Sequence, residues 1–319
     1  MILNLKTVFV TFMAAGLLGA CGGGDAGESN GSGLKVIATT TQIGALTREV
    51  AGDHIELTVL LTAGADAHDY EPNPQAVKRI GEAGLVLRNG IGLDEWLDDT
   101  LKSAGGTKRI VTVTNGVAVR MAGTEGGEGA EEHAEDKEGH EHEGEDPHVW
   151  HNPDNAKIMV DNIVAALSEV DGANATTFKA NGDAYKAKLD AVDAEIRKLI
   201  AEIPAENRKM VTNHDAFGYF IERYGLTFVG AVIPSSNKDA QASAKELAEL
   251  QDLINRQSVK VIFAEEEVDP KVARELAKDT NVTIVEGLFA DSLGKKGSGA
   301  DTIDGMLLFN ARKIAEALK

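Results

Sequence analysis

The chain has 319 residues, of which 43% are hydrophobic, and it carries a formal net charge of -19. Proteins that bind nucleic acids present basic surfaces to the phosphate backbone, so this acidic composition argues against a nucleic-acid partner. The single cysteine, Cys21, excludes an intramolecular disulfide. The fold must therefore be stabilised by a core rather than by a covalent cross-link.

The first twenty residues have the pattern of an export signal. Lys6 precedes an apolar run at residues 8–18, and the sequence Leu18-Gly19-Ala20-Cys21 follows. A run of this length is too short to span a hydrocarbon core of about 30 Å, which needs about 20 helical residues. We therefore expect residues 1–20 to be a signal peptide that is removed, not a permanent membrane anchor.

The four residues that end at Cys21 resemble the bacterial lipobox. In that motif the signal is cut before the cysteine and the thiol is diacylated, so the resemblance implies a lipid anchor on Cys21. The alternative is a chance cysteine beside an ordinary cleavage site. Residues 21–33 contain no large apolar side chain and predict a flexible tether, so the folded body should start near Leu34.

Residues 34–113 alternate short β-branched runs with helical stretches, which is the pattern of βαβ units around a mostly parallel sheet. Helices are expected to begin at Gln42, Asn73 and Asp94, and strands are expected at residues 34–40, 55–61, 84–88 and 109–113. Further along, Asn152 and Pro153 predict a helix start, because asparagine caps helices and proline favours the first helical position.

An acidic segment at residues 123–146 interrupts this pattern. Between Thr124 and Asp146 there are eleven carboxylates, one lysine and three histidines, which supply about half of the net charge. Burial cannot offset the entropy cost of ordering such a segment, so we expect a disordered loop inserted into the first lobe. Its histidines either form an accessory zinc site or belong to a solvated acidic spacer; they are His133, His140 and His142.

The strongest helical pattern lies at residues 175–203, where apolar residues recur at spacings of three, four or seven. A second βα series follows, with strands expected at residues 209–213, 227–233, 259–264 and 282–288, and helices that include residues 242–257 and 302–318. The predicted fold class is α/β, with two Rossmann-like lobes joined by one long rigid helix. Their predicted bounds are residues 34–170 for the N-terminal lobe, 171–203 for the connecting helix and 204–319 for the C-terminal lobe, with the ligand site in the cleft between lobes.

Side chains that bind metals fall where strands of both lobes end. His68 follows the second strand, His214 follows the first strand of the second lobe, and Asp291 follows the last strand. His148 lies where order is expected to resume after the acidic segment. Ligands of open α/β sheets bind beyond the carboxyl ends of the strands, so these side chains are candidate ligands of one ion. Three imidazoles and one carboxylate match Zn2+, whereas Mn2+ favours a second carboxylate in place of one histidine.

Four motifs carry these residues, in the order His68-Asp69-Tyr70-Glu71-Pro72, Asp146-Pro147-His148-Val149-Trp150, Asn213-His214-Asp215-Ala216-Phe217 and Ala290-Asp291-Ser292-Leu293. Over nearly all of residues 34–319 the chain resembles the solute-binding proteins of ATP-binding-cassette importers for zinc and manganese. The resemblance implies two α/β lobes, a rigid connecting helix, and a metal ion held between the lobes by His68, His148, His214 and Asp291. Manganese-type members typically have a glutamate at the third position, so His214 resembles the zinc-type (ZnuA/TroA-like) pattern.

Other polar residues near the motifs have alternative explanations. His151 is either a further ligand or, as we expect, a residue near the entrance of the site. Tyr70 and Trp150 are expected to pack around the site and exclude water. The run of Glu265, Glu266 and Glu267 at a strand end is expected to form a solvated edge or a surface that faces the importer, and a spare metal carboxylate is the alternative.

These observations predict a monomeric, exported receptor that is anchored through Cys21 and delivers Zn2+ to the permease of an ABC importer. The alternatives are a manganese receptor of the same family and a lipid-anchored adhesin or metal buffer. A zinc hydrolase is disfavoured, because four protein ligands would close the site to water and the chain has no His-Glu-x-x-His helix. Binding by neutral imidazoles should weaken as the pH falls through about 6.5.

Overall fold

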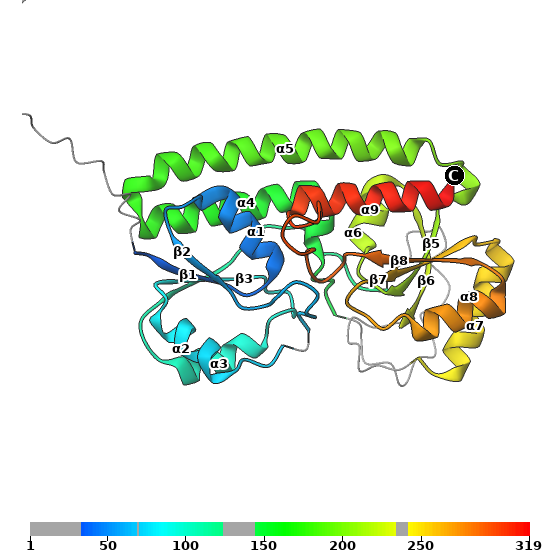
Figure 1. Cartoon of the computed structure of the whole chain (residues 1–319), viewed down its shortest axis with the longest axis horizontal. Helices are drawn as coiled ribbons and strands as arrows, with labels where there is room; N and C mark the ends of the chain where they lie inside the picture. The colour runs from blue at the N-terminus through cyan, green and yellow to red at the C-terminus, as the bar shows by residue number, and fades with distance from the viewer. Residues whose placement is uncertain (1–32, 69, 124–143, 234–241) are drawn as a thin grey trace, which may run out of the picture. The chain divides into compact units, whose positions relative to one another are not determined.

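The computed structural model describes residues 33–68, 70–123, 144–233 and 242–319 (Figure 1). The predicted signal peptide, Cys21, all but the last residue of the predicted tether, and His133, His140 and His142 lie outside the described residues. Within the described ranges, no helix is long and apolar enough to cross a membrane.

The first lobe is built on a parallel sheet with the strand order β2-β1-β3-β4. Its strands are β1 Lys35–Ala38, β2 Glu56–Val59, β3 Leu85–Arg88 and β4 Arg109–Thr112, each one to three residues shorter than predicted. Consecutive strands are joined by the helices α1 Thr41–Ala51, α2 Pro74–Glu82 and α3 Trp96–Ala104. The predicted βαβ pattern is confirmed in this lobe.

The second lobe repeats the arrangement, with the strand order β6-β5-β7-β8 and parallel pairing throughout. Its strands are β5 Lys209–His214, β6 Thr227–Ile233, β7 Val261–Glu265 and β8 Thr283–Leu288. Its helices are α6 Gly218–Tyr224, α7 Ala244–Gln257, α8 Lys271–Thr280 and α9 Ile303–Leu318. In each sheet the strands that come first and third in the sequence lie side by side at the centre. The order in which strands are added to the sheet reverses between these two strands. Ligands of open α/β sheets bind at such a point.

Two long helices run between the sheets in sequence. α4 spans Pro153–Val170, and the side chain of Asn152 caps it by accepting the N–H of Asp154 at 2.9 Å, as predicted. α5 spans Ala175–Ala201 and packs against α1 and α4 of the first lobe and against α6 and α9 of the second (Figure 1). One helix therefore supports both lobes.

Two contacts fix α5 to its neighbours on either side. A Cβ atom on Gly182 would lie 2.6 Å from Cγ2 of Val164, so the glycine permits close approach of α4. In the other direction, the hydroxyl of Tyr185 donates a 2.8 Å hydrogen bond to Asp304 at the start of α9.

A single hydrophobic cluster extends through both lobes. It includes Val36 in β1, Phe178 and Leu189 in α5, Phe263 in β7 and Ile314 in α9. Two smaller clusters fill the opposite faces of the sheets, one under α2 and α3 and one under α7 and α8. Each sheet is thus covered on both faces, as expected for parallel sheets, and the larger core is common to both lobes.

Candidate metal centre

The four candidate ligands meet beyond the carboxyl ends of the strands. Nε2 of His148 lies 3.3 Å from Nε2 of His68 and 2.9 Å from Oδ1 of Asp291. Nε2 of His214, the last residue of β5, lies 3.1 Å from Oδ2 of Asp291. Ligand atoms of His68, His148 and Asp291 all lie within 4.8 Å of one another, and His214 joins the group through Asp291. The structure therefore brings all four predicted residues together.

Most of this group is closed to solvent. The side chains of His148, His214 and Asp291 are 0%, 4% and 1% exposed, whereas His68 is partly exposed. His68 also lines a pocket of about 310 Å³, together with Glu95, Glu145 and other residues of the first lobe. Solvent thus reaches the centre from the His68 side.

Asp146 holds His148 in place. Its Oδ1 accepts the backbone N–H of His148 at 3.0 Å and contacts the ring Nδ1 at 2.7 Å. Arg120 pairs with the other oxygen of Asp146 at 2.6 Å. A proton on Nδ1, directed at Asp146, leaves the lone pair of Nε2 facing Asp291 and His68. This is how an outer carboxylate fixes the tautomer and orientation of a metal-binding histidine.

Hydrogen bonds fix the loop of Asp291 to both lobes. On one side, the N–H and the hydroxyl of Ser292 donate to Glu267 at 3.0 and 2.8 Å. On the other, the hydroxyl of Ser292 accepts the N–H of Gly64 at 2.9 Å, and the ring N–H of Trp150 donates to the carbonyl of Ala290 at 3.1 Å. The loop that carries the carboxylate is thus tied to the loop that leads to His68.

Comparisons with known proteins identify the family of the chain. The family model described as "ZnuA: Zinc-uptake complex component A periplasmic" matches residues 36–317. The chain belongs to this family. It is 33% identical to the manganese ABC transporter substrate-binding lipoprotein PsaA of Streptococcus pneumoniae over 99% of both chains. It is also 33% identical to the metal ABC transporter substrate-binding lipoprotein SsaB of Streptococcus sanguinis, again over 99% of both chains.

Solved structures of family members show the same fold. The periplasmic zinc-binding protein TroA of Treponema pallidum superposes with a TM-score of 0.78 at 27% identity, covering 90% of this chain and 99% of TroA. A Mn-bound periplasmic metal-binding protein of Candidatus Liberibacter asiaticus, an S38A mutant, gives a TM-score of 0.78 at 27% identity and covers 90% and 100%. The predicted family and the fold of two parallel-sheet lobes with a long helix are confirmed.

At the candidate metal centre, burial and the neighbouring charges shift the pKa values in opposite directions. Burial alone would lower the pKa of His148, but Asp291 and Asp146 outweigh it and raise that pKa to about 9. Burial is likewise outweighed at His214, whose pKa is raised well above 6.5 by Asp291 and Glu265. The two imidazoles in turn hold the pKa of Asp291 well below its ordinary value, despite burial. At His68, burial prevails and lowers the pKa.

The glutamate run at the end of β7 differs from its prediction. We expected a solvated edge, but the side chain of Glu265 is 0% exposed and Glu267 is bonded to the Asp291 loop. Only Glu266 is exposed. Burial and the charge of Asp291 raise the pKa of Glu267 to about 7. Glu265 is the last residue of β7, a strand that is buried along its whole length, and Glu266 and Glu267 follow it in the bend beyond the strand.

His151 also differs from its prediction, since it is fully buried and does not line the entrance. It ends a short 3-10 turn, Val149–His151, and its ring packs between Trp150 and Phe217 at centroid distances of 5.9 and 4.9 Å. Burial lowers its pKa to about 3. Trp150 packs against His148 at 5.5 Å as expected, whereas Tyr70 packs against Trp96.

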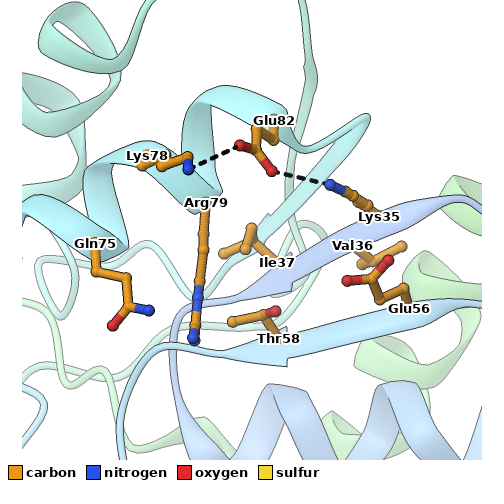
Figure 2. A pocket seen from close by; sticks show the side chains of 9 residues that line it. All are labelled: Lys35, Val36, Ile37, Glu56, Thr58, Gln75, Lys78, Arg79 and Glu82. Carbon is orange, nitrogen blue, oxygen red and sulfur yellow. Dashed lines mark hydrogen bonds and ion pairs between the residues drawn. The ribbon is translucent and has the colours of Figure 1, made fainter.

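A second pocket, of about 360 Å³, lies in the first lobe between α2 and the strands β1 and β2 (Figure 2). Its polar side chains are largely paired, because Lys35 and Lys78 both contact Glu82, at 2.9 and 3.9 Å. No histidine is among its lining residues. The candidate ligands lie instead beside the pocket that His68 lines.

Proposed function

We propose that the chain is a receptor that captures Zn2+ outside the cytoplasmic membrane through His68, His148, His214 and Asp291. The observation that carries the proposal is the convergence of His68, His148 and Asp291, with His214 in contact with the same carboxylate at 3.1 Å. Zinc is typically held by four nitrogen, sulfur or oxygen ligands in tetrahedral geometry. Loops from both lobes supply these ligands, so a bound ion cross-links the lobes.

Orphaned polar atoms at the centre support a metal ion there. Among the described residues, neither Nε2 of His214 nor Oδ1 of Asp291 has a hydrogen bond of normal geometry. Buried polar atoms without partners are costly, so a native protein is expected to satisfy them. A cation that accepts lone pairs from these atoms removes the cost.

Manganese is the second candidate cargo. The relatives named PsaA are manganese lipoproteins, and a similar solved structure holds Mn. Mn2+ is harder than Zn2+ and prefers carboxylate oxygen to imidazole. The centre has one carboxylate, Asp291, against three imidazoles, so its donor set favours zinc.

The receptor is exported and anchored by a lipid. Relatives that match 99% of the chain are named lipoproteins, and the Leu18-to-Cys21 sequence supplies the acceptor cysteine. Their names also state that they belong to ABC transporters, so the partner of this receptor is the permease of an ABC importer. Since four protein ligands would leave no position for a catalytic water, we assign no enzymatic activity.

Metal content tests the proposed site. The mature receptor is purified from cells grown in medium with equal concentrations of zinc and manganese. Elemental analysis is expected to find about one zinc per chain. Asp291→Ala and His214→Ala should lose most of it. His54→Ala is the matched control, because it removes a histidine that packs beside Phe178 and away from the centre. Unchanged zinc in both site variants would refute the site.

A change of donor type tests the choice of zinc. In His214→Glu a second carboxylate replaces an imidazole, so the ratio of manganese to zinc affinity should rise at least tenfold. A wild-type protein that already prefers manganese in the same competition would decide for the second candidate. Expression of the protein in cells that lack the receptor gene distinguishes a transport receptor from a metal buffer. Only a transport receptor restores zinc uptake in these cells.

A further inference from the structure

His148 and His214 each have a carboxylate beside Nδ1 of the ring, but the two carboxylates differ in their surroundings. Asp146, behind His148, is paired with the guanidinium of Arg120 at 2.6 Å. Glu265, behind His214, lies 3.5 Å from Nδ1 of that ring through its Oε2. Among the described residues, neither oxygen of Glu265 has a hydrogen-bond partner. The first carboxylate is thus neutralised locally, and the second is not.

The position of Glu265 is fixed by the sheet. It is the last residue of β7, the strand next to β5 in the sheet, and β5 ends at His214. The side chain is 0% exposed, so water does not solvate the carboxylate. A buried charge without a partner is strongly destabilising and persists in native proteins when it is paired or faces a metal. Glu265 and Asp291 face opposite nitrogens of the His214 ring, at 3.5 and 3.1 Å, so both carboxylates favour a positive charge at this point.

A divalent ion would supply that charge. If three imidazoles bind it as neutral ligands, two negative charges are needed for balance, and Asp291 provides only one. Arg120 already balances Asp146. Glu267 accepts hydrogen bonds from the N–H and the hydroxyl of Ser292. Asp215, which follows His214, accepts the N–H of Gly123 at 2.8 Å, so among these carboxylates Glu265 is the one without a hydrogen-bond donor.

We infer that Glu265 is a positioning residue of the metal centre, which directs Nε2 of His214 at the ion and supplies the second negative charge that balances a divalent cation. The inference rests on the proposed metal site. It goes beyond the ligand set, because Glu265 acts through His214 and its charge. Outer carboxylates of this kind typically change metal affinity about 10- to 100-fold when they are removed.

The test separates the charge of Glu265 from its shape. Glu265→Gln keeps an oxygen that can accept the N–H of His214 but removes the charge, and Glu265→Asp keeps the charge on a shorter side chain. Glu266→Gln is the matched control, since it makes the same change at the exposed neighbour. Zinc dissociation constants are measured by chelator competition, and the His214 ring N–H is followed by nitrogen NMR. Thermal unfolding of the metal-free proteins checks the fold.

The expected result is a dissociation constant about 10- to 100-fold higher for Glu265→Gln, a smaller increase for Glu265→Asp, and none for Glu266→Gln. A shifted ring N–H signal in Glu265→Gln supports the contact with His214. Wild-type affinity in Glu265→Gln would overturn the inference, as would equal losses in the Gln and Asp variants. If Asp291→Ala loses zinc while Glu265→Gln does not, only this inference fails. If Asp291→Ala keeps its zinc, the proposed site fails.

Discussion

Zinc binding should depend steeply on pH, because protons and the ion compete for the same ring nitrogens. In the metal-free protein His148 has a pKa of about 9, and the pKa of His214 is also raised. Both imidazoles are therefore charged at pH 7, with a proton on each Nε2. The ion must displace the two protons, whereas His68, with its lowered pKa, contributes none.

The magnitude follows from the number of protons displaced. Each proton changes the binding free energy by about 1.4 kcal/mol per pH unit, so two protons give about 2.7 kcal/mol, or 100-fold in affinity. Affinity should thus rise about 10⁴-fold from pH 6 to pH 8 and level off only as the pH passes about 9, the pKa of His148. Histidines with the ordinary value of about 6.5 would give an almost flat response above pH 7.5.

Calorimetric zinc titrations at pH 7, in buffers with different ionisation enthalpies, count the released protons directly. About two protons per ion are expected, and fewer than one would refute the reasoning. Asp291 and Asp146 together raise the pKa of His148, and Asp146→Asn removes the second of them, so proton release should be smaller than in the wild type. Chelator competition between pH 7 and 8, corrected for protonation of the chelator, gives an independent measure, and an unchanged dissociation constant would contradict it.

Three further predictions concern stability. Metal-free protein should lose up to about 3 kcal/mol between pH 6.5 and 9, because a raised histidine pKa stabilises the fold below the unfolded value and the gain is lost above the folded one; urea unfolding at several pH values measures it. Gly182→Ala should destabilise by about 1 to 2 kcal/mol, since overpacking against Val164 exceeds the gain in helix propensity, and wild-type stability would show that α4 and α5 adjust. Tyr185→Phe should cost about 1 to 3 kcal/mol by removing the donor to Asp304, as judged by the urea midpoint.

The regular elements were predictable because their signals are local. Alternating apolar runs indicated the strands, and Asn152 with Pro153 located the start of α4 within one residue. The bounds of α6 were not predicted, because a seven-residue helix is too short for periodicity to be distinct. The candidate ligands were predictable since carboxyl ends of parallel strands meet at one edge of a sheet.

The surroundings of the ligands were not predictable, because they depend on contacts between distant residues. Three consecutive glutamates give no polar–apolar alternation, so the sequence does not reveal that Glu265 and Glu267 face inwards while Glu266 faces solvent. The hydroxyl of Tyr219 donates to the carbonyl of Asp146, 73 residues away, and no local pattern indicates such a pair. Burial of His151 likewise follows from packing against Phe217, in the other lobe.

The core that runs from Val36 through α5 to Ile314 affects how the protein unfolds and is degraded. Because neither lobe has a main core of its own, the two should unfold together in one transition. An ion held by the native protein alone then stabilises every part of the chain, by about 2.7 kcal/mol at 100 times its dissociation constant. Metal supply would thus set how long the receptor survives proteases outside the cytoplasm, and receptors without cargo would be degraded first.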